Sequence, residues 1–66
     1  MTEWVTVTAR RRQLRARRND GEPCDVQTAD GPRRCYTGDW IIWDEATDRR
    51  DVCPGPQFAA RYVRVF

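Results

Sequence analysis

The sequence predicts a mainly β fold: a small single-domain β-barrel or strongly bent antiparallel sheet of about five to six short strands, with one short helix near residues 56–62. Short segments rich in β-branched and aromatic residues recur along the chain, and clusters of Gly, Pro, Asn and Asp separate them. Neither half of a chain of 66 residues could bury a core of its own. Residues 1–66 are therefore expected to form a single β-rich domain.

The first element expected is a strand over residues 4–9, because Trp-Val-Thr-Val-Thr-Ala alternates with a period of two. The next apolar residues, Leu14 and Ala16, have the opposite parity. Side chains alternate strictly along a strand, so a bulge or a tight bend must separate them from the first strand. We expect a second extended segment over residues 13–18. The alternative is a helix over residues 9–18, since Arg, Gln, Leu and Ala all favour helices.

The middle of the chain is typical of a hairpin. Asn-Asp-Gly-Glu-Pro at residues 19–23 predicts a turn, because Asp-Gly is a strong hairpin signal and Pro cannot continue a β-ladder. A short strand is expected over residues 24–28 and a returning strand over residues 33–36. The intervening Ala-Asp-Gly-Pro at residues 29–32 supplies the turn between them.

The C-terminal part begins with a Gly-Asp turn and the run Trp-Ile-Ile-Trp, which is apolar on both faces. Such a strand, here residues 39–44, is usually central in a sheet. A polar connection leads to a partner strand over residues 49–53, and Pro-Gly-Pro then breaks the chain. Residues 57–62 are expected to form one or two helical turns, because an aromatic pair spaced four apart stacks on one face of a helix. Residues 63–65 close as a last strand.

Three cysteines, Cys24, Cys35 and Cys53, lie in these strands. Their spacing contains no Cys-x-x-Cys pair and the chain has no His, so the sequence predicts no metal site. We expect buried, reduced thiols, with an intermolecular or transient disulfide as an unsupported alternative. If the hairpin closes symmetrically about Asp30-Gly31, Val26 faces Cys35 and Cys24 lies diagonal to it.

The composition excludes most catalytic chemistry. The chain has no His, no Ser and no Lys, so it lacks the usual general base, a serine nucleophile and a Schiff-base amine. The remaining carboxylates, tyrosines and cysteines form no recognisable catalytic set. We therefore expect no enzyme, no catalytic residues and no cofactor.

All twelve basic residues are arginines, and half of them fall within nine positions. This basic patch consists of Arg10, Arg11, Arg12, Arg15, Arg17 and Arg18. Guanidinium groups bind phosphate oxygens bidentately, so a strand bearing Arg15 and Arg17 beside Gln13 would suit a nucleic-acid backbone. The alternatives are a solvated edge strand that uses charge to resist edge-to-edge pairing, and a surface that binds an acidic protein.

An acidic loop is the second candidate binding surface, and it consists of Asp44, Glu45 and Asp48. It could imitate the charge spacing of nucleic-acid phosphates or hold an arginine-rich partner. The alternative is a polar hairpin loop whose charges pair locally with Arg49 and Arg50.

The turn and strand over residues 38–42, the hairpin before them and the Phe-x-x-x-Tyr spacing of Phe58 and Tyr62 resemble a family of small uncharacterised phage and bacterial proteins. Members of that family carry a Pro-Gly-Asp-Tyr/Trp turn, a hairpin and a C-terminal Phe-x-x-x-Tyr segment. The resemblance covers about residues 24–65, although Thr37 stands where the family has Pro. It implies a compact β-rich accessory protein of a phage or prophage. No activity is implied, so no functional residue is carried over.

From these features we expect a non-enzymatic interaction module, phage- or prophage-encoded, that binds a host protein through its charged surfaces. The basic patch would lie on one side of a rigid small barrel and the acidic loop on another. Analogy with other small phage proteins extends the expectation to inhibition of a host defence or regulatory factor. The alternative is a nucleic-acid-binding accessory protein that uses the Arg10–Arg18 ribbon, although a net charge of +2 argues against a strong general nucleic-acid binder.

The expected location is the cytoplasm of the host cell, with no membrane partner. The first residues show no basic segment followed by an apolar run, and no stretch approaches the roughly 18 apolar residues of a membrane-spanning helix. Exposed strand edges leave a homodimer open as an alternative.

Overall fold

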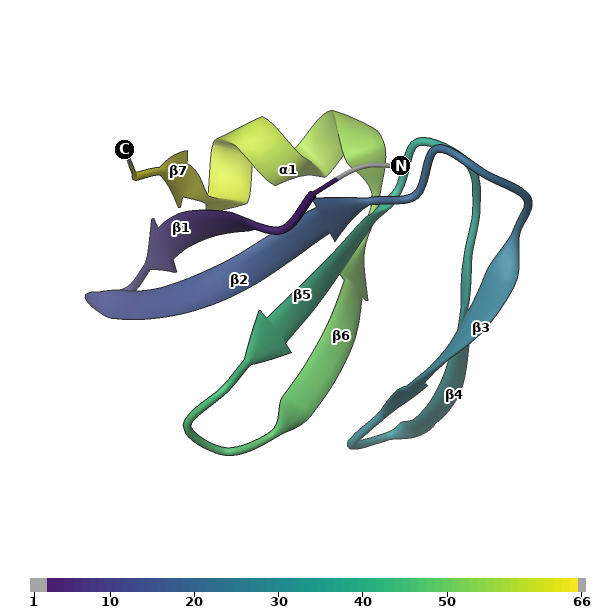
Figure 1. The fold of residues 1–66 in the computed structure, drawn as a ribbon, viewed down its shortest axis with the longest axis horizontal. Coiled ribbons are helices and arrows are strands. Elements are labelled where there is room, and N and C mark those ends of the chain that lie inside the picture. Colours follow the sequence, from purple (N-terminus) through teal and green to yellow (C-terminus); the bar gives the residue numbers. More distant parts are fainter. Residues whose placement is uncertain (1–2, 66) are drawn as a thin grey trace.

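The computed structural model describes residues 3–65 and confirms the mainly β fold. This part of the chain contains seven strands and one helix, all seen in Figure 1. In chain order the elements are β1 (Val5–Ala9), β2 (Arg12–Arg18), β3 (Cys24–Thr28), β4 (Gly31–Cys35), β5 (Trp40–Asp44), β6 (Arg49–Cys53), α1 (Gly55–Arg61) and β7 (Val63–Arg64). They form a five-stranded antiparallel sheet in the order β6-β5-β2-β1-β7 and a separate β3-β4 hairpin. The outer strands β6 and β7 do not pair with each other, so the sheet is open and is not a closed barrel.

The two faces of the five-stranded sheet are covered by different elements. Helix α1 packs on one face through Phe58 and Tyr62, and the β3-β4 hairpin lies beside β6 (Figure 1). The core under α1 consists of Val7, Ala16, Ile42 and Cys53. A second, smaller core lies under the hairpin and consists of Val26, Cys35 and Val52, with Ile41 packed against it. The domain therefore divides its limited apolar area between two thin layers.

A tight bend separates the odd-numbered apolar residues of β1 from the even-numbered ones of β2, which was one of the two possibilities expected from the sequence. Arg10 and Arg11 adopt φ values of 52° and 64°, which form the left-handed two-residue turn that matches the twist of a hairpin. The turn pairs Val7 with Leu14, so both side chains reach the α1 face. The alternative helix over residues 9–18 is not formed, because the apolar residues of β2 gain burial only when they alternate onto that face.

The expected register of the β3-β4 hairpin is wrong by two residues. The turn is formed by Ala29 and Asp30, and Gly31 is already the first residue of β4, with φ of 102°. Cys24 consequently lies directly opposite Cys35, and Val26 lies opposite Arg33. The reason is that Gly31 tolerates a left-handed backbone within the strand, so the turn closes one residue earlier than the Asp-Gly signal indicates.

A network of hydrogen bonds around Asp39 joins three loops at one end of the sheet. The Asp39 carboxylate accepts from the backbone N–H of Tyr36 at 3.1 Å and from the N–H of Gly55 at 3.2 Å. The backbone of Asn19 bonds to both residues of the Gly38-Asp39 turn, at 2.7 and 2.8 Å. The Gly-Asp-Trp segment therefore connects the β2-β3 loop, the β4-β5 turn and the start of α1.

Aromatic stacking fixes α1 on the sheet. The Trp40 and Phe58 rings stack with centroids 3.9 Å apart, and Phe58 stacks on Tyr62 at 5.4 Å. The expected pairing of Phe58 with Tyr62 is thus confirmed, although α1 itself ends at Arg61. None of the described residues belongs to a helix long and apolar enough to cross a membrane.

Candidate binding surface

The face of the five-stranded sheet opposite α1 is only partly covered, and it carries a tryptophan and several arginines. Alternation along the strands sends one set of residues to this side, and the β3-β4 hairpin covers only Ile41 and Val52 among them. We call the remainder the open face: Thr6, Thr8, Gln13, Arg15, Arg17, Trp43 and Arg50.

One row of side chains crosses the open face from β6 to β1. Arg50 lies opposite Trp43, Trp43 opposite Arg15, and Arg15 opposite Thr6. The Arg50 guanidinium stands 5.3 Å from the centre of the Trp43 ring, within the range of a cation–π contact. Neighbouring strands thus hold an indole between two arginines, each of which is about half exposed.

Trp43 itself is held in place on several sides. Its ring packs against Trp4 at a centroid distance of 5.7 Å and an interplanar angle of 58°. Its indole N–H donates to the Asp48 carboxylate at 3.1 Å. Asp48 lies in the turn between β5 and β6 with φ of 52°, so the turn conformation aims this carboxylate back at the strand. The ring is therefore a fixed and only partly exposed feature of the surface.

The structure disperses the predicted basic patch. Arg10 and Arg11 occupy the β1-β2 turn, and the four arginines of β2 alternate between the two faces of the sheet. Arg15 and Arg17 share the open face with Gln13, as the alternation in the sequence predicts. Arg12 and Arg18 project to the α1 side. No single ribbon of six arginines is formed.

The predicted acidic loop does not form a separate patch but pairs with the arginines of β2. Arg12 forms an ion pair with Asp44, and Arg15 Nε lies 2.6 Å from the Glu45 carboxylate. Asp48 lies 3.5 Å from Arg50, so local pairing occurs as well. The expectation of opposed basic and acidic sides is wrong, because β5 lies next to β2 and brings the β5-β6 turn to its arginines.

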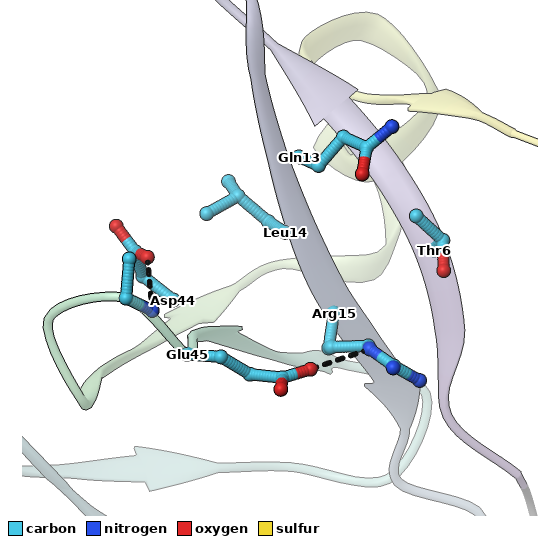
Figure 2. Close-up of a pocket in the computed structure, with 7 residues that line it drawn as sticks. Thr6, Gln13, Leu14, Arg15, Asp44 and Glu45 are labelled. Atoms are coloured by element: carbon cyan, nitrogen blue, oxygen red, sulfur yellow. Dashed lines mark hydrogen bonds and ion pairs between the residues drawn. The ribbon is translucent and has the colours of Figure 1, made fainter.

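A shallow pocket of about 290 Å³ opens where the loop meets β2 (Figure 2). It is lined by Thr6, Gln13, Leu14, Arg15, Asp44, Glu45 and Ala46. Figure 2 shows the Arg15–Glu45 ion pair at one side of this pocket. Side chains of both charges and one leucine line it, so the pocket suits a peptide-like group better than a purely anionic one.

Cys24 lines a pocket with Arg17 of the open face, whereas Cys53 lies in the core under α1. Cys35 and Cys53 are buried and Cys24 is exposed, all three as free thiols. Among residues 3–65, no group of three His, Cys, Asp or Glu side chains is arranged to hold a metal ion. Burial raises the pKa of Cys35 to about 11, with smaller contributions from Cys24 and Asp39. Burial also raises the pKa values of Cys53 and Tyr62.

These raised pKa values predict that the protein loses stability in alkaline solution. In the unfolded chain Cys35 ionises near its ordinary pKa of 9.0, whereas in the folded protein it keeps its proton up to about pH 11. Stability is therefore unaffected below pH 9 and falls between these two values, because the unfolded state releases the proton first. Urea unfolding at about pH 8 and about pH 10.5 measures this fall. Cys35→Ala should flatten it, and an equal fall in this variant would contradict the assignment.

Sequence reasoning did not identify Arg50 as the neighbour of Trp43, or Thr6 as the neighbour of Arg15, although strand parity places each residue on one side of its own strand. The sequence does not reveal the order of the strands in the sheet, and this order places Arg50, Trp43, Arg15 and Thr6 side by side. With this geometry in hand, comparison with known proteins adds no relative: the chain matches no protein-family model, no curated protein and no solved structure.

Proposed function

We propose that this protein is a non-enzymatic binding module whose open face docks on another protein. The observation that carries the proposal is the row Arg50–Trp43–Arg15–Thr6, which holds an indole between two half-exposed arginines. Trp and Arg are the residues most enriched at the energetic centres of protein interfaces. Their fixed positions on neighbouring strands reduce the entropy lost on binding.

Mixed charge favours a protein over a nucleic acid as the partner. Glu45 and Asp48 lie within 4 Å of Arg15 and Arg50, so any phosphate approaching these arginines also meets two carboxylates. Trp43 is already contacted by Trp4 and by the Arg50 guanidinium, and a base that stacked on its ring would compete with these two contacts. A protein surface, in contrast, can offer both an acidic and a basic group to such a row.

The resemblance to small phage and bacterial accessory proteins suggests which partner to test. We propose a cytoplasmic protein of the host cell, with inhibition of a defence or regulatory factor as the consequence of masking its surface. The nucleic-acid alternative keeps one supporting observation: Arg10, Arg11 and Arg17 are in no ion pair with any other residue between 3 and 65.

Site-specific photocrosslinking tests the proposal. A benzoylphenylalanine at Gln13, on the open face, is expected to form one adduct with a cellular polypeptide, and the same group at Gln57 is expected to form none. Gln57 is a matched control because it is also an exposed glutamine but lies on α1. Arg15→Glu should abolish the adduct at Gln13, because it reverses the charge beside Trp43.

Three results would contradict the proposal. They are adducts of equal yield at Gln13 and Gln57, no adduct at either position, and an adduct that nuclease removes. The last result would favour the nucleic-acid alternative. Fluorescence polarisation with duplex DNA and single-stranded RNA then provides a check, since phosphate contacts would make binding fall steeply between about 50 and 300 mM salt. We expect no binding across this range.

A further inference from the structure

A second hollow lies on the α1 side of the sheet, away from the open face. It is about 620 Å³ in volume and is lined by Ala9, Arg10, Arg12, Leu14, Arg61 and Tyr62. Figure 1 shows the β1-β2 turn and the C-terminal end of α1 on the same side of the molecule, and the hollow lies between them. Three of its six lining residues are arginines and none is a carboxylate.

The three arginines come from different elements, so the fold and not the sequence brings them together. Arg10 is held in the β1-β2 turn by its left-handed backbone, Arg12 begins β2, and Arg61 ends α1. Within the described chain, Arg10 and Arg61 form no ion pair, and Arg12 pairs with Asp44, which lies outside the hollow. Arg10 and Arg61 thus bring two uncompensated positive charges to the hollow, and a bound anion would compensate them.

Tyr62 adds a hydrogen-bond donor to these charges. The ordinary pKa of a tyrosine phenol, 10.0, already keeps the hydroxyl protonated in the neutral range, and burial raises the pKa of Tyr62 further. A neutral phenol can donate to an anion, which a phenolate could not do. The Leu14 side chain and the Tyr62 ring form an apolar wall beside these polar groups.

We propose that this hollow binds the phosphate group of a small phosphate monoester. The two guanidinium groups of Arg10 and Arg61, which are in no ion pair with another described residue, and the Tyr62 phenol match the several terminal oxygens of such a dianion better than the two oxygens of a carboxylate, and Arg12 adds a third guanidinium whose charge Asp44 partly compensates. The apolar wall would contact the organic part of the ester. The hollow is separate from the row Arg50–Trp43–Arg15–Thr6, which lies on the other face of the sheet, and it shares only Leu14 with the pocket beside Arg15.

Titration of the ¹⁵N-labelled protein with inorganic phosphate and with AMP, followed by NMR, tests this site. We expect saturable shifts at the amides of Arg10, Arg12 and Tyr62, with no equivalent shifts in sodium chloride of matched ionic strength. AMP is expected to bind more tightly than phosphate because it also contacts Leu14 and Tyr62. Equal affinities would identify free phosphate as the ligand of the same site.

Two arginines of similar exposure give a matched pair of variants. Arg61→Gln is expected to weaken binding about tenfold, because one charge-assisted hydrogen bond is lost. Arg64→Gln removes the same charge from β7, outside the hollow, and is expected to leave binding unchanged. Shifts that sodium chloride reproduces, equal weakening in both variants, or no saturable shift would each overturn the proposal.

The same titration distinguishes this site from the proposed protein interface. Arg15→Glu alters the open face and is expected to leave phosphate binding unchanged. Loss of phosphate binding in Arg15→Glu would overturn the independence of the two surfaces. Loss of the photocrosslinked adduct with retained phosphate binding is the result that we expect for this variant.

Discussion

Replacing Asp39 by alanine is expected to lower the free energy of unfolding by about 3 kcal/mol, since hydrogen bonds to charged groups each contribute about 1.5–3 kcal/mol. The Asp39 carboxylate accepts from the backbone N–H groups of Tyr36 and Gly55, at 3.1 and 3.2 Å. Alanine would leave both donors without this partner, one in the β4-β5 turn and the other at the start of α1. For so small a domain this loss is a large part of the total stability.

Urea denaturation followed by tryptophan fluorescence measures this effect. Asp39→Asn keeps one oxygen acceptor and should lose about half as much stability. Asp30→Ala is the control, because Asp30 lies in the exposed β3-β4 turn and uses only its backbone N–H in the hydrogen bond to Thr28. Equal urea midpoints for Asp39→Ala and Asp30→Ala would show that the hydrogen-bond network around Asp39 does not stabilise the fold.

Replacing Gly55 by alanine is expected to cost about 2 kcal/mol or more, in the range found for overpacked sites. A Cβ atom at Gly55 would lie 2.5 Å from the carbonyl oxygen of Gly38, which is a backbone atom and cannot rotate away. The first turn of α1 would have to move from the Gly38-Asp39 turn. That movement would also lengthen the hydrogen bond from Gly55 to Asp39.

Gly21→Ala is the matched control for this substitution. The nearest atom to a Cβ at Gly21 is the Asn19 side-chain oxygen at 3.7 Å, an ordinary van der Waals distance. Because alanine also restricts the unfolded chain, Gly21→Ala is expected to change stability by less than about 1 kcal/mol in either direction. Thermal unfolding of the two variants side by side provides the measurement. Similar melting temperatures would contradict the close approach of Gly55 to Gly38.

Both predictions concern the contact between the Gly38-Asp39 turn and the start of α1. The Gly-Asp-Trp segment at residues 38–40 thus has a structural role. Gly38 allows a backbone φ of 91°, Asp39 joins two loops, and Trp40 stacks on Phe58 of α1. The segment therefore acts as the junction of the fold. The candidate surfaces lie elsewhere, on the open face and in the hollow beside the C-terminal end of α1.

The positions of the strands follow from local patterns. Alternating apolar residues over residues 4–9 and the apolar run at residues 40–43 specify strands, and Gly, Pro, Asn and Asp specify the turns between them. The hairpin register did not follow, because Gly31 can belong either to the turn or to the strand. A left-handed glycine is compatible with both, and only the packing of Cys35 against Val26 and Val52 selects one.

The sequence by itself therefore determined the type and order of the elements, and the side of each strand on which a residue lies. Only the tertiary structure decided which strands are neighbours. Arg15 and Glu45 are distant in the sequence, and they pair because β2 lies between β1 and β5. The physical reason is that alternation is a property of one strand, whereas charge pairing and pockets depend on contacts between strands, which the burial of the whole core selects.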